Sequence, residues 1–410
     1  MKKTSHIEIR PERLLKDLRD LAQFGKLTTG VSRVSFSESD VQARQWLKTR
    51  MEGAGLIAEF DAVGNVHGRI NTDARSIILG SHTDSVPVGG WLDGSLGVIY
   101  GLEIARSVME SGLESDIGID VISFMDEEGT YLACLGSKSF CRELGDEERS
   151  NGQSPSGERL PDAVERSGFG ENPVIEIDPA RHLAYLEAHI EQGPRLEAGQ
   201  KEIGIVTGIV GIRRYRLEVT GEADHAGTVP MSMRKDAGAA AIGLLHSLFQ
   251  AVEKAKGPES VWNAGSMQFE PGAANVVPAR AEVIFEIRDL EPAILNSMES
   301  SIHETAERIS LDGDISYLVT KTIDIPPSAM DTRLSDHILH SANAIGASNM
   351  KMPSGAGHDA MVLSRHVPSA MLFIPSINGK SHSEAEDTSD ENIIIGCQVL
   401  AGSVESIALS

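Results

Sequence analysis

Apolar and polar residues in the first third of the chain form the patterns of helices and strands in turn. The segment 37–53 opens with Ser, Glu and Asp and closes on glycine, which predicts a capped helix. A strand-like stretch follows at 56–70, then a buried strand at 76–82, a helix over 96–111 and a strand over 117–129. Because strands alternate with helices, this region predicts an α/β fold with a largely parallel sheet.

The pattern changes in the middle of the chain. From Gly211 the expected order is strand, helix, strand, strand, helix, strand, which is typical of a ferredoxin-like βαββαβ domain. The α/β pattern then resumes after a Pro-containing turn. We therefore predict one domain formed by residues 1–210 and 325–410, with a second domain, 211–324, inserted into it.

Composition narrows the classes of function. The 410 residues carry a net charge of -23, which argues against a nucleic-acid partner because phosphate binding needs a basic surface. An anionic substrate would need a local arginine in that field. No apolar run approaches the roughly 18 residues of a membrane span. With three cysteines in the chain, the composition favours a reduced, cytoplasmic setting and no membrane partner.

Candidate chemistry rests on five of the thirteen histidines, which lie in polar turns. The five are His82, His189, His225, His358 and His382. His82 and the acidic run 126–128 both follow predicted strands, so we expect them at one edge of the sheet. Together with Asp93 they favour a His/carboxylate metal centre. Such a ligand set without thiolates suits zinc, manganese, cobalt or nickel in a hydrolytic site.

Three carboxylates have further expected roles. Asp84 lies two residues after His82, on the same side of an extended segment, so its carboxylate is expected to orient that imidazole. Turn chemistry explains Asp84 and Asp93 equally well. Glu127 and Glu128 are adjacent at a strand end and point to opposite sides, which favours one metal ligand and one general base. The alternative is a solvated acidic turn.

Seven motifs in order resemble those of the M20 metallopeptidase-type amidohydrolases, in their hydantoinase/carbamoylase branch. That branch holds N-carbamoyl-L-amino acid hydrolases, β-ureidopropionases, allantoate amidohydrolases and ureidoglycolate amidohydrolases. The likeness covers nearly the whole chain. The motifs are GSHTDSVPVGGWLDGSLGV, FMDEEGT, HIEQGPRLE, GEADHAGTVPMSMRKDA, NVVPARAEVIFEIRD, SGAGHDA and FIPSINGKSHSEAE.

The resemblance implies a zinc-exopeptidase-like catalytic domain, an inserted lid and dimerisation domain, and two divalent metal ions per subunit. The implied metal ligands are His82, Asp93, Glu128, His189 and His382, with Asp93 bridging the ions. Glu127 would be the general base and Asp84 the partner of His82. The implied substrate-binding residues are Gln192, His225, Asn275, Arg288, Gly357 and His358, and His225 would also stabilise the oxyanion. Members typically form homodimers through the inserted domain, and some of these residues reach the neighbour's active site.

The expected activity is cleavage of the carbamoyl C–N bond of a ureido acid by a metal-bound hydroxide. The substrate is of the N-carbamoyl-L-amino acid, allantoate or ureidoglycolate type, and Arg288 would bind its carboxylate. An M20 aminopeptidase or N-acyl amino acid deacylase is the alternative enzyme, and a catalytically silent binding protein is a third hypothesis. The segment GTYLACLGS lacks an arginine that the branch often has there, which leaves substrate contacts on that side open.

Overall fold

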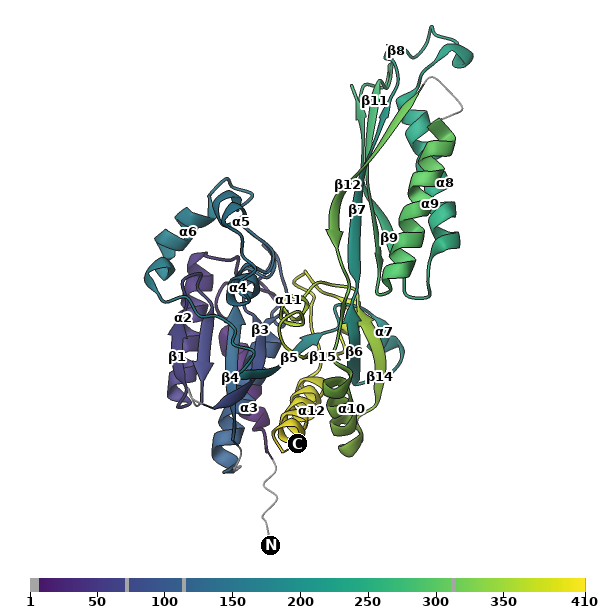
Figure 1. Cartoon of the computed structure of the whole chain (residues 1–410). Coiled ribbons are helices and arrows are strands. Elements are labelled where there is room, and N and C mark those ends of the chain that lie inside the picture. Colours follow the sequence, from purple (N-terminus) through teal and green to yellow (C-terminus); the bar gives the residue numbers. More distant parts are fainter. Residues whose placement is uncertain (1–6, 71–73, 113–115, 311–314, 410) are drawn as a thin grey trace. The chain divides into compact units, whose positions relative to one another are not determined.

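A nine-stranded mixed sheet organises the larger of two structural units (Figure 1). The computed structural model describes residues 7–70, 74–112, 116–310 and 315–409. The chain divides into one unit of residues 1–207 and 330–410 and a second unit of residues 208–329.

The larger unit contains helices from the chain before residue 208 and from the chain after residue 329. They are α1 (Pro11–Leu21), α2 (Glu38–Gly53), α3 (Ser95–Ser111), α4 (Leu135–Phe140), α5 (Asp146–Asn151), α6 (Leu160–Ser167), α7 (Arg195–Ala198), α10 (Thr332–Ala344), α11 (Ala360–Leu363) and α12 (Asp390–Ala408). The strands of the nine-stranded sheet are β1 (Ile57–Phe60), β2 (Val66–Arg69), β3 (Arg75–His82), β4 (Ile117–Phe124), β5 (His182–Ile190), β6 (Ile203–Ile209), β13 (Ser328–Ala329), β14 (Asn349–Ser354) and β15 (Ser369–Ile374). β13 and the last two residues of β6 fall within the residue range of the second unit.

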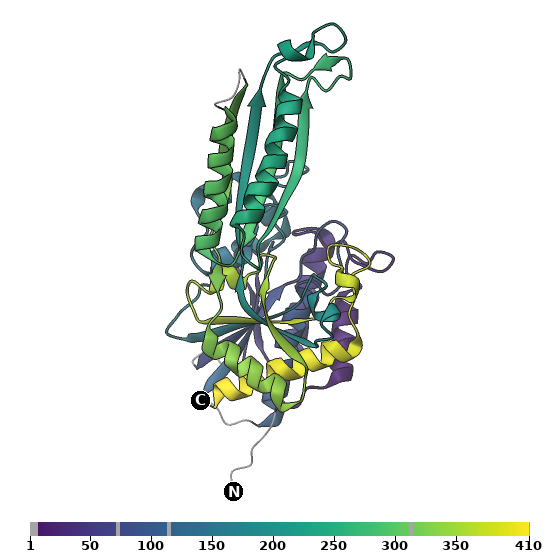
Figure 2. The ribbon, with the colours of Figure 1, turned by 90° about the vertical axis from the view of Figure 1, so that its right-hand side faces the viewer.

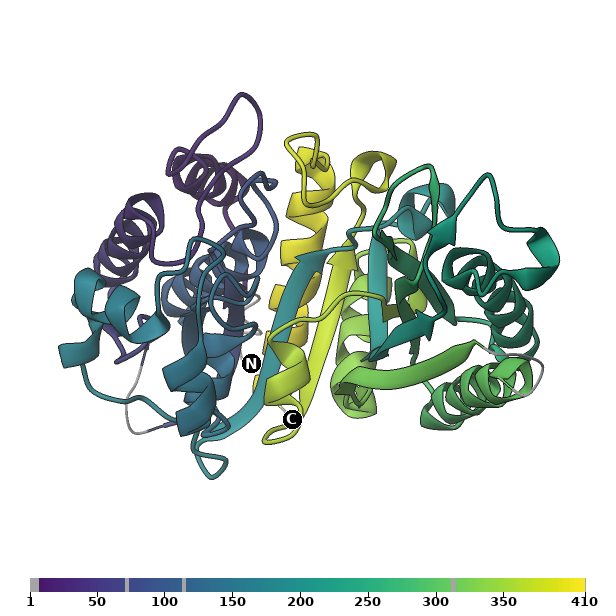
Figure 3. The same ribbon diagram turned by 90° about the horizontal axis from the view of Figure 1, so that it is seen from above.

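The centre of this sheet is parallel. The strand order is β1-β2-β4-β3-β5-β15-β6-β13, with β14 paired to β6. The pairs β4–β3, β3–β5 and β5–β15 are parallel, whereas the flanking pairs β1–β2, β2–β4, β15–β6 and β6–β13 are antiparallel. β5 and β15 run side by side in the view of Figure 3. The predicted α/β fold with a largely parallel sheet is confirmed.

Apolar helix faces cover the sheet. One buried cluster joins α1, α2, α3, α10 and α12 to the central strands. In α2, the expected helix over 37–53, Ser37 accepts the backbone N–H of Asp40 as the N-cap. α10 and α12 pack against each other and against β15 (Figure 2).

Two arginines are buried beneath the carboxyl ends of β3 and β4. Arg44 of α2 pairs with Asp40 at 2.8 Å and donates to the carbonyl oxygen of Phe124 at 3.0 Å. Arg33 donates to the carbonyl oxygen of Thr83 at 2.5 Å. Both arginines are almost fully buried. They therefore link the N-terminal segment to the two loops that follow these strands.

The second unit has its own sheet and core. It contains β7 (Gly211–Thr220), β8 (Asp224–His225), α8 (Ala237–Ala255), β9 (Val261–Glu270), β10 (Val276–Val277), β11 (Arg280–Asp289), α9 (Pro292–Ser310) and β12 (Ser316–Ile325). The four long strands form an antiparallel sheet in the order β12-β7-β11-β9, and β8 pairs with β10. α8 and α9 pack on the same apolar core as this sheet. None of the helices in the described ranges combines the length and hydropathy that crossing a membrane requires.

Candidate metal centre

The candidate metal ligands of the first half of the chain gather at one edge of the central sheet. β3 ends at His82, the acidic run 126–128 follows β4, and His189 is the penultimate residue of β5. β3 is the parallel neighbour of both other strands, and His82 lies opposite Phe124, the last residue of β4. The imidazole of His82 and the acidic run therefore meet at the carboxyl edge of the sheet, as expected.

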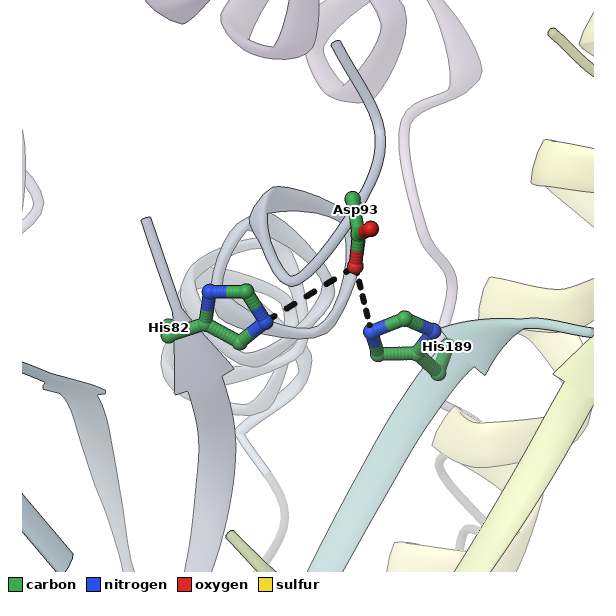
Figure 4. Close-up of side chains that lie close together, drawn as sticks. All are labelled: His82, Asp93 and His189. Carbon is green, nitrogen blue, oxygen red and sulfur yellow. Dashed lines mark ion pairs between the residues drawn. The ribbon is translucent and has the colours of Figure 1, made fainter. Parts of the chain in front are cut away.

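Asp93 lies between two buried imidazoles (Figure 4). Its Oδ1 atom is 3.8 Å from Nε2 of His82 and 3.0 Å from Nε2 of His189. Donor atoms of the three side chains lie within 4.8 Å of one another, a spacing that can hold a metal ion. Gly94 permits this approach, because it has a φ of +63° and an added Cβ would lie 2.4 Å from the His82 ring.

The outer nitrogen of each of these imidazoles faces a main-chain carbonyl. Nδ1 of His82 is 3.0 Å from the carbonyl oxygen of Asp84, and Nδ1 of His189 is 2.8 Å from that of Ile190. Because a carbonyl oxygen only accepts, both Nδ1 atoms donate. This arrangement orients both Nε2 atoms toward Asp93, as metal-binding histidines require.

Asp84 orients His82 through its main chain rather than, as we expected, through its carboxylate. The carboxylate lies farther from Nδ1 of His82, at 3.8 Å. Its oxygens accept the backbone N–H groups of Asp126 at 3.1 Å and Glu128 at 3.3 Å, and Arg44 lies 3.4 Å away. These donors converge on the carboxylate, which leaves the carbonyl oxygen for the imidazole. Asp84 therefore links the His82 loop to the acidic loop.

Asp93 also belongs to a second set of candidate metal ligands, and we call each of the two sets a donor group. Nε2 of His382 is 3.4 Å from Oδ2 of Asp93 and 3.6 Å from Oε2 of Glu128. Donor atoms of these three side chains also lie within 4.8 Å of one another. His382 differs from the other members because its side chain is 52% exposed. The two oxygens of Asp93 thus face two different groups, Oδ1 the buried pair of imidazoles and Oδ2 the more exposed group.

Glu127 belongs to neither donor group. Its Oε2 atom is 3.7 Å from Nε2 of His82. Burial raises the pKa of Glu127 well above its usual range, and the charges of Glu128 and Asp359 raise it further. Burial, followed by the charge of Asp93, also raises the pKa of Glu128 to about 8. Both side chains therefore bind protons far more readily than exposed glutamates do.

Neighbouring carboxylates also raise the pKa values of two imidazoles, on which burial acts in the opposite direction. Burial would lower the pKa of His189, but the hydrogen bond to Asp93 and the negative charges of Asp93 and Glu187 together outweigh burial and raise that pKa to about 9. The hydrogen bond to Asp93 likewise raises the pKa of His382 to about 9, against the effect of burial. The acidic cluster attracts positive charge strongly, whether as protons on these rings or as metal ions.

The donor set fits a divalent metal ion. Imidazole nitrogens and carboxylate oxygens without thiolates are ligands for zinc, manganese, cobalt or nickel. In the part of the chain that the structure describes, the buried Oε1 atom of Glu128 has no hydrogen-bond partner. A buried acceptor without a donor is costly in free energy unless a cation satisfies it. The residues are therefore compatible with divalent-metal binding.

Two of the other expected pocket residues of the larger unit lie beside this centre. Nε2 of Gln192 donates to Oδ2 of Asp93 at 3.1 Å. The buried His358 ring packs edge-on against His189, with 4.6 Å between the ring centroids. Burial lowers the pKa of His358 well below its usual range, so this ring stays neutral. Gly357 is exposed, with no atom within 4 Å of an added Cβ.

The expected substrate-binding residues of the second unit fall at two ends of its sheet. His225 pairs with Val276 in the β8–β10 ribbon, directly beside Asn275. Both His225 and Asn275 are exposed. Arg288 lies near the opposite end of β11, where its guanidinium makes two 2.7 Å contacts to Glu286. Alternation on β11 places Glu286 and Arg288 on the face away from the buried core, as the sequence predicts.

Residues 78–406 match the signature of peptidase family M20/M25/M40. The chain belongs to this family. The resemblance inferred from the motifs is confirmed, and the His/carboxylate cluster lies within the matched segment.

Relatives of this M20 chain cover almost its whole length. It is 33% identical over 408 residues to an N-carbamoyl-L-amino acid amidohydrolase of Geobacillus stearothermophilus, covering 98% of this chain and 99% of the relative. It is 33% identical over 394 residues to an allantoate amidohydrolase of Bacillus subtilis (strain 168), covering 95% of each. A crystal structure of an amidase of the hydantoinase/carbamoylase family from Burkholderia phymatum is 41% identical, covers 98% of each chain and superposes with a TM-score of 0.92.

Sequence reasoning missed two buried charged residues at the loops of the M20 centre, Arg44 and Glu386, and it did not assign Asp126 of the acidic run its contacts. Asp126 accepts the backbone N–H groups of residues 130–132 at 2.7 to 2.9 Å. Arg44 contacts Asp84, and Glu386 accepts the backbone N–H of Asp93 at 3.0 Å. The signal for Arg44 was its position on the apolar face of α2, where a charged residue needs a buried partner. Glu386 lies within the motif KSHSEAE, but the spacing of that motif does not reveal its partners.

We predict that affinity for a divalent ion rises as the pH is raised from about 7 to about 9. His189 and His382 have pKa values of about 9, so below that pH metal ions compete with protons. Calorimetric titrations with Mn²⁺ at pH 7, in two buffers of different ionisation enthalpy, should show proton release. His246→Asn, a change outside the candidate centre in the second unit, serves as the control with unchanged proton release. Constant affinity across this range would contradict the prediction.

Proposed function

We propose that this M20 chain is a metal-dependent amidohydrolase that cleaves the carbamoyl C–N bond of a small ureido acid. The observation that carries the proposal is the position of Asp93 between two groups of candidate ligands, with one carboxylate oxygen facing each group. The relatives named for N-carbamoyl-L-amino acid and allantoate hydrolysis support the substrate class. Their match over almost the whole chain favours this activity over peptide or N-acyl hydrolysis.

The proposed cofactor is a pair of divalent ions, of zinc, manganese, cobalt or nickel. His82, Asp93 and His189 would hold one ion, and Asp93, Glu128 and His382 would hold the other. Bound divalent ions polarise a carbonyl oxygen and lower the pKa of water. Asp84 would keep the His82 ring in place through its carbonyl oxygen.

Glu127 is the proposed general base and acid. Its raised pKa suits a carboxylate that takes a proton from the attacking water and holds it until the next step. The water oxygen bonds to the carbamoyl carbon, the C–N bond breaks, and Glu127 returns the proton to the departing nitrogen. Its position outside both donor groups leaves it free for this role.

The remaining pocket residues of the larger unit have more limited proposed roles. The amide of Gln192 contacts Asp93, and this contact supports a role for Gln192 in binding a substrate at the centre. His358 would form a neutral wall behind His189, because its ring is buried and its Nε2 atom lies 2.9 Å from the Ser354 hydroxyl. Gly357 would let substrate approach the main chain without obstruction by a side chain.

We propose that the second unit is a ferredoxin-like lid and dimerisation domain. The element order βαββαβ and the strand order β12-β7-β11-β9 support the fold assignment. Arg280 pairs with Thr220 close to the β8–β10 ribbon, whereas Arg288 lies eight residues farther along β11. At a rise of roughly 3.3 Å per residue, that distance is ~26 Å, longer than a small ureido acid.

This separation supports a homodimer. If His225 and Asn275 act on the same substrate molecule as Arg288, one copy of the unit cannot supply all three side chains. A second copy of the chain would supply His225 and Asn275 to the active site served by Arg288.

The test of the proposed function is ammonia release from a panel of substrates. The panel contains allantoate, ureidoglycolate, N-carbamoyl-β-alanine and several N-carbamoyl-L-amino acids, with dipeptides and N-acyl amino acids as comparison. We expect the chelated chain to be inactive and added Mn²⁺, Zn²⁺ or Co²⁺ to restore turnover of a ureido acid. Full activity with metal absent by elemental analysis would refute the metal requirement, and preference for peptides would refute the substrate class.

Glu127→Gln should abolish turnover with metal content close to that of the wild type, because it removes proton transfer but no proposed ligand. The matched change Glu128→Gln should lower occupancy of one metal position. Elemental analysis and kcat for the two variants give the comparison. Equal metal content and equal rates in both variants would contradict the division of roles.

Arg288 should leave its partner Glu286 and bind the substrate carboxylate instead. Arg288→Ala is expected to cost at least about 2 kcal/mol in kcat/KM, and Arg288→Lys should raise KM because lysine lacks the planar fork. Arg214→Ala is the matched control, since Arg214 pairs with the same glutamate from the neighbouring strand. A substrate whose carboxylate is replaced by an amide should be poor for the wild type and nearly indifferent to Arg288→Ala. Equal losses for both substrates would make Arg288 structural.

A further inference from the structure

Glu386 is a buried carboxylate that joins two distant segments of the larger unit. Its Oε1 atom accepts the backbone N–H groups of Leu92 at 3.1 Å and Asp93 at 3.0 Å. Its Oε2 atom accepts the hydroxyl of Ser381 at 2.9 Å. The side chain is only 2% exposed. One carboxylate thus holds both the loop of Asp93 and Ser381, the residue just before His382, and Glu386 itself is 293 residues from Asp93 in sequence.

The surrounding chain is shaped for this carboxylate. A Cβ added to Gly90 would lie 1.9 Å from the carboxyl carbon of Glu386, so only glycine leaves room for it there. The two N–H groups that it accepts are adjacent and converge on a single oxygen. Loss of the acceptor would leave buried donors unpaired, which is unfavourable. Glu386 belongs to neither donor group of the metal centre.

The second donor group depends more than the first on the hydrogen bonds by which Glu386 joins the Asp93 loop to Ser381. His82 and His189 lie on paired strands and are buried, so the sheet itself positions them. His382 is half exposed, lies outside the helices and strands and has a φ of +49°. Packing of its ring therefore does little to place it. Ser381, its neighbour, contacts Oδ2 of Asp93 at 3.2 Å as well as Glu386.

We propose that Glu386 is a positioning residue that couples the Asp93 loop to the His382 loop and so builds the second metal position. The inference rests on the proposed two-ion centre. Glu386 acts through hydrogen bonds to the main chain and to Ser381 and does not touch the ion or the substrate. Residues that orient metal ligands in this way typically contribute about 10- to 100-fold to metal affinity.

Two substitutions separate this role from alternatives. In Glu386→Gln the amide oxygen can still accept both N–H groups and the amide N–H can donate to Ser381, so two ions should bind with affinities within a few-fold of the wild type. Glu386→Met removes both acceptors and should weaken the second ion about 10- to 100-fold. The first ion shares Asp93 but should be weakened less, because paired strands position His82 and His189. The readouts are the stoichiometry and affinity of Mn²⁺ by calorimetry and elemental analysis on the full chain, together with kcat.

Asp289 provides the matched control. It is equally buried in the second unit, where it accepts a backbone N–H of Glu291 at 2.7 Å and the hydroxyl of Ser260. Asp289→Asn and Asp289→Leu should leave Mn²⁺ stoichiometry unchanged. If Glu386→Met does not fold, as judged by circular dichroism with chelator present, Ser381→Ala replaces it and should weaken the second ion several-fold.

Each outcome is decisive. Retention of two wild-type affinities in Glu386→Met, or in Ser381→Ala where that variant replaces it, would overturn the proposal. Equal loss in Glu386→Gln and Glu386→Met would also overturn it, because the charge rather than the positioning would then matter. A wild-type chain that binds a single ion would overturn the two-ion centre itself, and that failure is visible without any substitution.

Discussion

Carboxylates crowd at the carboxyl edge of the parallel strands, and their mutual repulsion is the constraint on which the site depends. Burial and neighbouring negative charge raise the pKa values of both Glu127 and Glu128. Buried charge of this density is tolerated only with opposite charge or hydrogen-bond donors at close range. Arg44 supplies a positive charge next to Asp84. The imidazoles next to Asp93 supply positive charge when they are protonated, or nitrogen ligands to a metal ion.

Main-chain N–H groups supply much of the remaining compensation. Asp84, Asp126 and Glu386 each accept two or more backbone N–H groups of loops at the candidate centre. A charge-assisted hydrogen bond of this kind is stronger than a neutral one. The same negative charges that need compensation therefore also hold the loops that present the candidate ligands. Removing one partner from such a buried set typically costs about 3–5 kcal/mol when it leaves a charge unpaired.

The two donor groups of the centre differ in how they are supported. The first is carried by paired strands, whereas the second depends on His382 in an irregular segment. Glu386 contacts the loop of Asp93, which both groups share, and Ser381, which precedes His382 of the second group. In the inserted unit, β11 separates Arg288 from His225 and Asn275 in the same chain. The expected substrate-binding residues of this unit therefore lie near opposite ends of one long strand.

The order of elements, the interruption of the α/β pattern and the chemical nature of the candidate ligands could all be predicted from the amino-acid sequence. Those features are local, since hydrophobic period, capping residues and motif spacing are read within a few residues. The sequence also indicated that His82 and the acidic run share an edge, because parallel strands end together. Two contacts could be read only from the folded chain. Asp84 faces His82, two residues away, with its carbonyl oxygen because its carboxylate is held by Arg44 and by backbone N–H groups of the acidic loop, which are distant in sequence. Glu386 reaches Asp93 across 293 residues. Both contacts depend on strand register and loop paths that no local pattern encodes.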